Sequence, residues 1–107
     1  MNNFNKYLDE HYLRLLYNNY EDYYLKSIDE ENFDKVYNIL VNNKFTFIND
    51  IIIYYLEAFE LDSKYIEQSL KDMPNVLGDN YQEKISNNLK LFDEVIKKAI
   101  EYSEEDN

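Results

Sequence analysis

Turn-forming residues are almost absent from this chain, and their scarcity limits the folds open to it. Among 107 residues there is one glycine, Gly78, and one proline, Pro74. A domain built mainly from strands needs such residues every dozen positions or so, where the chain reverses. The shortage therefore predicts an all-α fold with short connections, and the length is that of a single domain over residues 1–107.

Apolar periodicity predicts five helices in a compact bundle. The most regular pattern is the last one, where apolar residues recur every three or four positions from Tyr81 to Ala99. Short polar stretches separate the segments, so consecutive helices are expected to pack side by side. The acidic residues 103–107 continue no apolar pattern and are expected to form a frayed tail. The predicted helices cover residues 4–26, 29–42, 46–61, 63–73 and 80–102.

The third of these helices, residues 46–61, is the most apolar segment of the chain. Wound as a helix, its polar residues crowd onto one narrow arc, which is typical of a helix with neighbours on several sides. The bundle is therefore expected to be organised around it. A strand over residues 44–53 is the alternative, because three consecutive isoleucines favour a sheet. No second strand of similar quality occurs elsewhere to pair with it.

Acidic residues outnumber basic ones, 22 to 11, which gives a net charge of −11. This sign opposes direct binding to nucleic acid and to an anionic membrane surface, and it predicts a basic protein as the partner. Residues 29–62 hold two basic and eight acidic side chains and are the most negative part. The first sixteen residues do not resemble a signal peptide and no apolar run could span a bilayer. We therefore expect a cytoplasmic protein without membrane contact.

Motifs for catalysis, metal binding or cofactor binding are missing from the sequence. There is no cysteine, and His11 is the only histidine, whereas a zinc site of nitrogen ligands needs several. A single glycine excludes glycine-rich phosphate loops. Adjacent carboxylates point about 100° apart on a helix and do not converge. We expect a non-enzyme without metal or cofactor, and a role of His11 as a general base is the alternative.

Tyrosine is unusually frequent, with twelve residues, and three of them suggest a contact surface. Tyr17, Tyr20 and Tyr24 share one stripe of the first predicted helix. Tyrosine is enriched among the residues that dominate binding energy, so the stripe is a candidate partner-binding surface. Alternatively, these rings lie at the boundary of the core with their hydroxyls in water.

Ile53 is an anomaly in the central segment, because it falls in the middle of the polar arc. Asp50, Glu57 and Glu60 surround it on a straight helix. An exposed isoleucine ringed by acids is suited to a basic partner with an apolar pocket, so all four are candidate partner-binding residues. The alternative is that a neighbouring helix covers Ile53.

A small, acidic, helical chain without catalytic motifs predicts a protein that binds and blocks another protein. The first hypothesis is a bacterial immunity protein or antitoxin that occludes a basic toxin or nuclease, with the acids steering the encounter. The second is a phage-type inhibitor that imitates DNA against a defence nuclease. The third is a non-catalytic structural module in which the tyrosine stripe pairs with a second copy. Monomer and homodimer both remain open.

Overall fold

Helices form all the regular structure in the computed structural model, which describes residues 1–106. No strand occurs in this range, which confirms the all-α class. Residues 1–106 form seven α-helices and three short 3₁₀ helices instead of five helices, because three of the predicted helices are divided. The elements are η1 (Phe4–Lys6), α1 (Glu10–Asn19), α2 (Asp22–Ser27), α3 (Glu30–Asn42), α4 (Ile48–Tyr54), η2 (Leu56–Phe59), α5 (Ser63–Val76), α6 (Tyr81–Asn87), η3 (Leu89–Leu91) and α7 (Phe92–Glu105).

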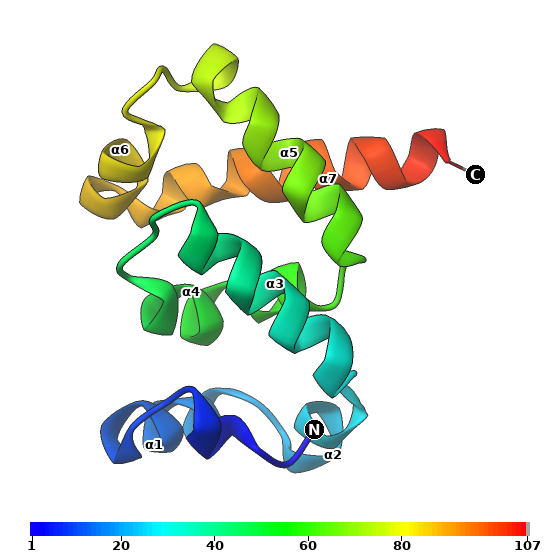
Figure 1. Ribbon diagram of the computed structural model, residues 1–107. Helices are drawn as coiled ribbons and strands as arrows, with labels where there is room; N and C mark the ends of the chain where they lie inside the picture. Colours follow the sequence, from blue (N-terminus) through cyan, green and yellow to red (C-terminus); the bar gives the residue numbers. More distant parts are fainter. Residues whose placement is uncertain (107) are drawn as a thin grey trace.

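The helices lie in three layers (Figure 1). One layer holds α1 and α2, the middle layer holds α3 and α4, and the third holds α5, α6 and α7. Helix α3 contacts α4, η2 and α5, and the largest helix interface joins α5 to α7. We refer to residues 1–28, with η1, α1 and α2, as the first layer.

Pairs of adjacent asparagines mark three helix ends. Helix α1 ends at Asn19, α3 at Asn42 and α6 at Asn87, and each belongs to an Asn-Asn pair. Asparagine competes for backbone hydrogen bonds, which favours helix ends over helix interiors. At the end of α3 the side-chain amide of Asn43 donates to the carbonyl of Ile39 at 2.8 Å. The first and last of the predicted helices are therefore interrupted at such pairs.

The predicted central helix over residues 46–61 is also divided. Helix α4 ends at Tyr54, and Tyr55 leaves the helical conformation with φ −137° and ψ 44°. The chain changes direction there, so both halves can turn their apolar side chains inward. Because α4 is helical, the strand alternative for residues 44–53 is wrong. The buried residues are Ile48, Ile51, Ile52, Ile53, Leu56, Ala58 and Phe59.

Helix α3 matches the prediction for residues 29–42 closely, whereas α5 runs past its predicted end. The expected stop before Pro74 is wrong, because α5 continues to Val76. Proline removes only its own backbone donor, and the amide of Leu77 still donates to the carbonyl of Met73 at 2.8 Å. A single missing bond in the last turns does not end the helix.

The predicted frayed tail is largely helical. Helix α7 extends to Glu105, and two contacts hold this end against α5. The Tyr102 hydroxyl donates to Asp72, and Asp106 lies 3.9 Å from the Lys64 ammonium. The last residue of the predicted tail, Asn107, lies outside the described residues.

The amino group of Met1 fixes the end of α2. It donates to the backbone carbonyls of Leu25, Lys26 and Ile28 at 3.2, 2.7 and 3.0 Å. The last carbonyls of a helix lack partners within the helix, and a positive charge suits that end of the helix dipole. This contact holds the segment that leads from α2 into α3.

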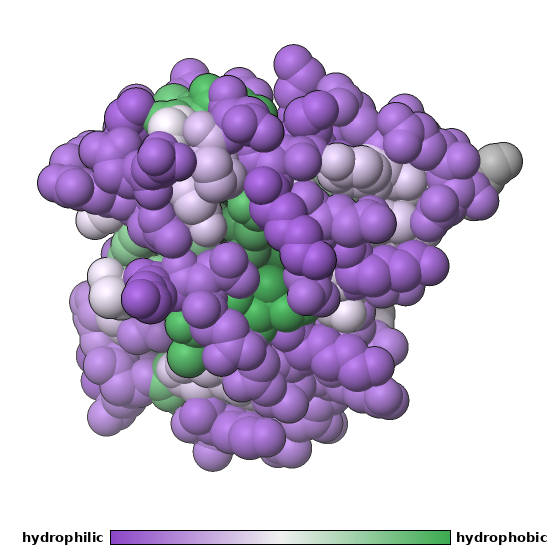
Figure 2. All heavy atoms as spheres, turned by 45° about the horizontal axis from the view of Figure 1, so that its top comes forward, coloured by the Kyte–Doolittle hydropathy of each residue, from purple (hydrophilic) through white to green (hydrophobic). Residues whose placement is uncertain are grey.

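Apolar side chains are gathered inside, and the surface is largely hydrophilic. The ring of Phe33 on α3 stacks on Phe59 of η2 with centroids 4.5 Å apart. Figure 2 shows one face covered mainly by hydrophilic residues, with hydrophobic residues at its top and in a narrow band down its middle. Within residues 1–106, no helix combines the length and the apolar character needed to cross a membrane.

Candidate functional site

Ile53, predicted as an exposed apolar anchor, lies in the core. Its side chain is 1% exposed, because the break at Tyr55 lets this side of α4 turn toward its neighbours. Its backbone carbonyl is engaged as well, since the Tyr20 hydroxyl donates to it at 2.8 Å. A side chain without accessible surface cannot contact a partner, so the prediction of an exposed Ile53 is wrong and the covered alternative is right.

The predicted stripe of Tyr17, Tyr20 and Tyr24 divides into two parts. Tyr17 is 51% exposed, whereas the other two are partly buried with ring centroids 5.7 Å apart. The Tyr24 hydroxyl donates to Glu60 at 2.5 Å. The Tyr20 hydroxyl donates instead to the Ile53 carbonyl, near the end of α4. Tyr20 therefore joins the first layer to α4, and Tyr24 joins it to the segment after η2.

Four of the seven residues predicted to contact a partner lie together: Tyr20, Tyr24, Glu57 and Glu60. Burial raises the pKa of Tyr20, and the charge of Glu57 adds to this effect. Burial and the hydrogen bond to Glu60 raise the pKa of Tyr24. Both phenols are therefore protonated donors at neutral pH, beside two carboxylates that are exposed on η2 and just after it.

Asp50 is engaged at a different contact, between α1 and α4. The Tyr12 hydroxyl donates to its carboxylate at 3.2 Å, and the charge of Asp50 raises the pKa of Tyr12. Asp50 is partly buried. This carboxylate contributes to packing of the first layer, and its predicted role in partner binding has no support from its surroundings.

Glu60 lies at a surface pocket of about 350 Å³. The pocket is formed by the turn between α2 and α3, the start of α3, and the connection from η2 to α5. Its apolar part comes from Ile28 and Phe59, which are otherwise buried. The lining residues are Ser27, Ile28, Asp29, Asn32, Phe59, Glu60 and Asp62. We refer to Asp29, Glu57, Glu60 and Asp62, with Tyr20 and Tyr24, as the acidic face.

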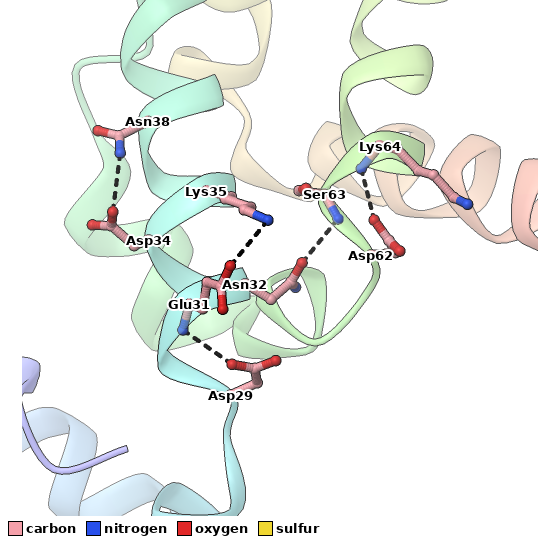
Figure 3. Close-up of polar contacts among 9 residues, drawn as sticks. All are labelled: Asp29, Glu31, Asn32, Asp34, Lys35, Asn38, Asp62, Ser63 and Lys64. Atoms are coloured by element: carbon pink, nitrogen blue, oxygen red, sulfur yellow. Dashed lines mark hydrogen bonds and ion pairs between the residues drawn. The ribbon is translucent and has the colours of Figure 1, made fainter.

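Two of the pocket carboxylates begin helices (Figure 3). Asp29 precedes α3 and accepts from the backbone N–H of Glu31 at 3.0 Å, and Asp62 precedes α5 and accepts from Lys64 at 3.1 Å. An aspartate there satisfies an amide that the helix leaves free and lies at the positive end of the helix dipole. Capping thus places both carboxylates at the pocket.

The acidic face keeps its negative charge. None of its four carboxylates forms an ion pair with another residue of the range 1–106. The lysines closest to it in sequence are paired with other acids. These pairs are Lys26 with Asp22 at 3.0 Å, Lys35 with Glu31 at 3.4 Å and Lys64 with Asp106 at 3.9 Å. The face therefore presents four carboxylates without an ion-pair partner to solvent.

The side chains of the acidic face are suited to binding a ligand. Its carboxylates and phenols can accept or donate hydrogen bonds and attract a cation. In the described part of the chain, no group of three or more histidine, aspartate or glutamate side chains could hold a metal ion. His11 is exposed on α1, where its ring centroid lies 5.4 Å from that of Tyr12.

Six of the seven pocket residues, all except Glu60, were missed as site residues by sequence reasoning. Asp29 and Asp62 stand just before helical patterns, where aspartate is a recognisable cap. Their positions could therefore be predicted, but not their proximity. Asn32 has no local signal, because its partners lie on the distant connection before α5.

Comparisons of the chain with protein-family models, with curated proteins and with solved structures find no significant match. Indications of function therefore come from the chemistry of the chain itself. They are concentrated at the acidic face, where charge, a pocket and two tyrosines coincide.

Proposed function

We propose that the protein binds a basic protein and blocks it, as an immunity protein or antitoxin blocks a toxin. The observation that supports this is the acidic face, with four carboxylates free of ion pairs, three of which line a pocket. A toxin or nuclease that holds phosphate groups carries the complementary positive charge. Covering its active site with the acidic face would exclude the substrate.

Charge and pocket act at different stages of such binding. The net charge of −11 attracts a basic partner and speeds the encounter. This attraction fades beyond about 8 Å at physiological salt, so close contact depends on other features. The pocket accepts a side chain of the partner, and the tyrosine rings add contact area of the kind found at binding hot spots.

The other two hypotheses predict different partners. A DNA mimic presents its carboxylates to the DNA-binding groove of a nuclease and competes with DNA. A homo-oligomeric module binds a second copy, and the exposed rings of Tyr17 and Tyr23 in the first layer suit such a contact. Each alternative is an outcome of the experiment below.

The test compares two variants that carry the same net charge, using the partner captured from the native host. The first removes the four charges of the acidic face and keeps both helix caps, because asparagine also caps helices. Its substitutions are Asp29→Asn, Glu57→Gln, Glu60→Gln and Asp62→Asn. The second is the control and removes four charges at exposed positions elsewhere. Its substitutions are Asp79→Asn, Glu83→Gln, Glu104→Gln and Glu105→Gln.

We expect the first variant to bind the partner roughly a hundredfold more weakly, and the control to lose less than about tenfold. Isothermal titration calorimetry at low and high salt measures both. Equal losses in the two variants would contradict a localised binding face. Competition by duplex DNA favours the mimic, and light scattering that detects a dimer built on Tyr17 and Tyr23 favours the structural module.

A further inference from the structure

Asn32 connects the two sides of the pocket. It lies in the first turn of α3, and its side chain reaches the connection between η2 and α5 (Figure 3). Its amide nitrogen donates to the carbonyls of Phe59 and Leu61 at 2.9 and 2.7 Å. Its amide oxygen accepts from the backbone N–H of Ser63 at 3.0 Å. One side chain thus holds both ends of the segment 60–62.

The position of this segment relative to α3 depends on these three bonds. Residues 60–62 belong neither to η2 nor to α5, and they carry two carboxylates of the acidic face. The third pocket carboxylate, Asp29, caps the helix that carries Asn32. The amide of asparagine supplies two donors and an acceptor at fixed angles. Aspartate lacks the donors and alanine lacks both, so neither residue can replace it. Asn32 therefore sets the distance between Asp29 and the carboxylates of Glu60 and Asp62.

We propose that Asn32 is a positioning residue for the binding of a basic partner. It holds the three pocket carboxylates so that a cationic side chain in the pocket can meet more than one of them. The inference rests on the proposed function, in which the acidic face receives a basic protein. It adds that the arrangement of the carboxylates, besides their number, determines affinity.

The substitution Asn32→Asp separates arrangement from charge. Aspartate keeps the acceptor for Ser63, loses both donors and adds one negative charge. If charge alone determines affinity, the variant binds a cation more tightly than the wild type; if arrangement does, it binds more weakly. Asn43→Asp is the matched control at the other end of α3. It makes the same change of charge and removes the bond to Ile39, away from the pocket.

The probe is an oligoarginine peptide, titrated by calorimetry into the full chain of the wild type and of both variants. Circular dichroism and urea unfolding first establish that each variant is folded. We expect Asn32→Asp to bind the peptide about tenfold more weakly and Asn43→Asp to bind at least as tightly as the wild type. Amide hydrogen exchange at residues 60–63 is expected to increase in Asn32→Asp only.

Equal or tighter binding by Asn32→Asp overturns the proposal, and so does equal weakening in both variants. If the wild type does not bind the peptide, the proposed function fails at this probe, and exchange alone decides the positioning role. Unchanged exchange at residues 60–63 then overturns that role, whereas a local increase supports it. If Asn32→Asp does not fold, Asn32→Ala and Asn43→Ala replace the pair, and equal binding by these two overturns the proposal.

Discussion

The first layer and the α5–α7 pair are held in the molecule by different kinds of contact. Helices α5 and α7 meet over the largest interface and bury mainly apolar side chains. Two side-chain hydroxyls add to this interface: buried Ser69 donates to the Val95 carbonyl at 2.6 Å, and Tyr102 donates to Asp72. The first layer also buries apolar residues, but four tyrosine hydroxyls join it to α3, to α4 and to the segment after η2. These bonds are Tyr7 to Asp34, Tyr12 to Asp50, Tyr20 to the Ile53 carbonyl and Tyr24 to Glu60.

The difference shows how a chain with few bases can attach a layer of helices. A phenol is a neutral donor, so it can bond a carboxylate without cancelling its charge. A lysine in the same place would neutralise the acid. The tyrosines therefore hold the first layer while the adjoining acidic face stays negative. Their bonds depend on protonation, whereas apolar burial between α5 and α7 does not.

The largest effect is expected in the core of the middle layer, on which the first layer packs. Ile53→Asp places an unpaired charge at a fully buried site, which costs more than about 4 kcal/mol of the free energy of unfolding. We expect both regions to unfold together in urea, followed by circular dichroism. Ile53→Val is the control and should lose about 1 kcal/mol. A stably folded Ile53→Asp variant would restore the exposed anchor predicted from the sequence.

Alkaline pH is expected to loosen the first layer more than the α5–α7 pair, because one phenol–carboxylate bond, from Tyr102 to Asp72, joins that pair, beside its apolar interface. Burial and a bond to a carboxylate raise the pKa of Tyr7 and of Tyr24 above the ordinary 10.0. The folded chain keeps these protons where the unfolded chain loses them. The stabilisation is therefore complete below about pH 10 and is lost as the pH rises toward the higher folded-state pKa.

Each of these tyrosines lowers the free energy of unfolding by at most about 1.4 kcal/mol per pH unit, and by less where solvent screens the pair. Hydrogen exchange and urea unfolding at neutral and alkaline pH measure the effect in each layer. The double variant Tyr7→Phe and Tyr24→Phe should flatten the dependence. The same slope in this variant would show that other groups cause the loss.

Tyr20→Phe is expected to weaken only the attachment of the first layer. It removes the hydroxyl that donates to the Ile53 carbonyl, next to the break between α4 and η2. One backbone carbonyl then loses its partner, which costs about 1–3 kcal/mol. Tyr17→Phe, on the exposed side of the same stripe, should change stability by less than about 0.5 kcal/mol. Equal effects in thermal unfolding would argue against the bridging role.

The smallest expected effect lies in the middle layer and has the opposite sign. Lys44 follows α3 in the left-handed region with φ 66°, and the amides of Lys44 and Phe45 donate to Val41 and Leu40 at 2.9 and 3.1 Å. Glycine adopts this conformation without strain, so Lys44→Gly should stabilise by up to about 1 kcal/mol. Lys35→Gly within α3 should destabilise by a similar amount. A higher urea midpoint for Lys44→Gly and a lower one for Lys35→Gly would confirm that backbone conformation determines the two effects.

The helical class could be predicted from the scarcity of turn residues, but helix continuity could not be predicted from apolar pattern. Tyr81, Ile85 and Phe92 form one apolar stripe, yet the chain breaks at Asn88 between them. A stripe reports which side of a segment is buried, and two successive helices can each turn that side inward. The pair Asn87-Asn88 carried the relevant local signal, as the pairs at the ends of α1 and α3 did.

The acidic face could be predicted in part. The acids of residues 57–62 and the tyrosines on the first layer follow from local composition. The burial of Ile53 depends on the break at Tyr55, which Tyr20 supports from a distant segment. Asn32 likewise reaches residues far along the chain. Such tertiary contacts override local pattern, and no single-sequence signal reports them.

Because neutral phenols attach the first layer, the stability of the fold and the binding of a partner should respond differently to ionic strength. A chain with a net charge of −11 repels itself, and added salt screens this repulsion, so the fold should become firmer in concentrated salt. Bonds from neutral donors lose little under the same conditions. Capture of a basic partner should weaken instead. A salt wash should therefore elute the proposed partner. The same salt should raise the free energy of unfolding of the protein that remains.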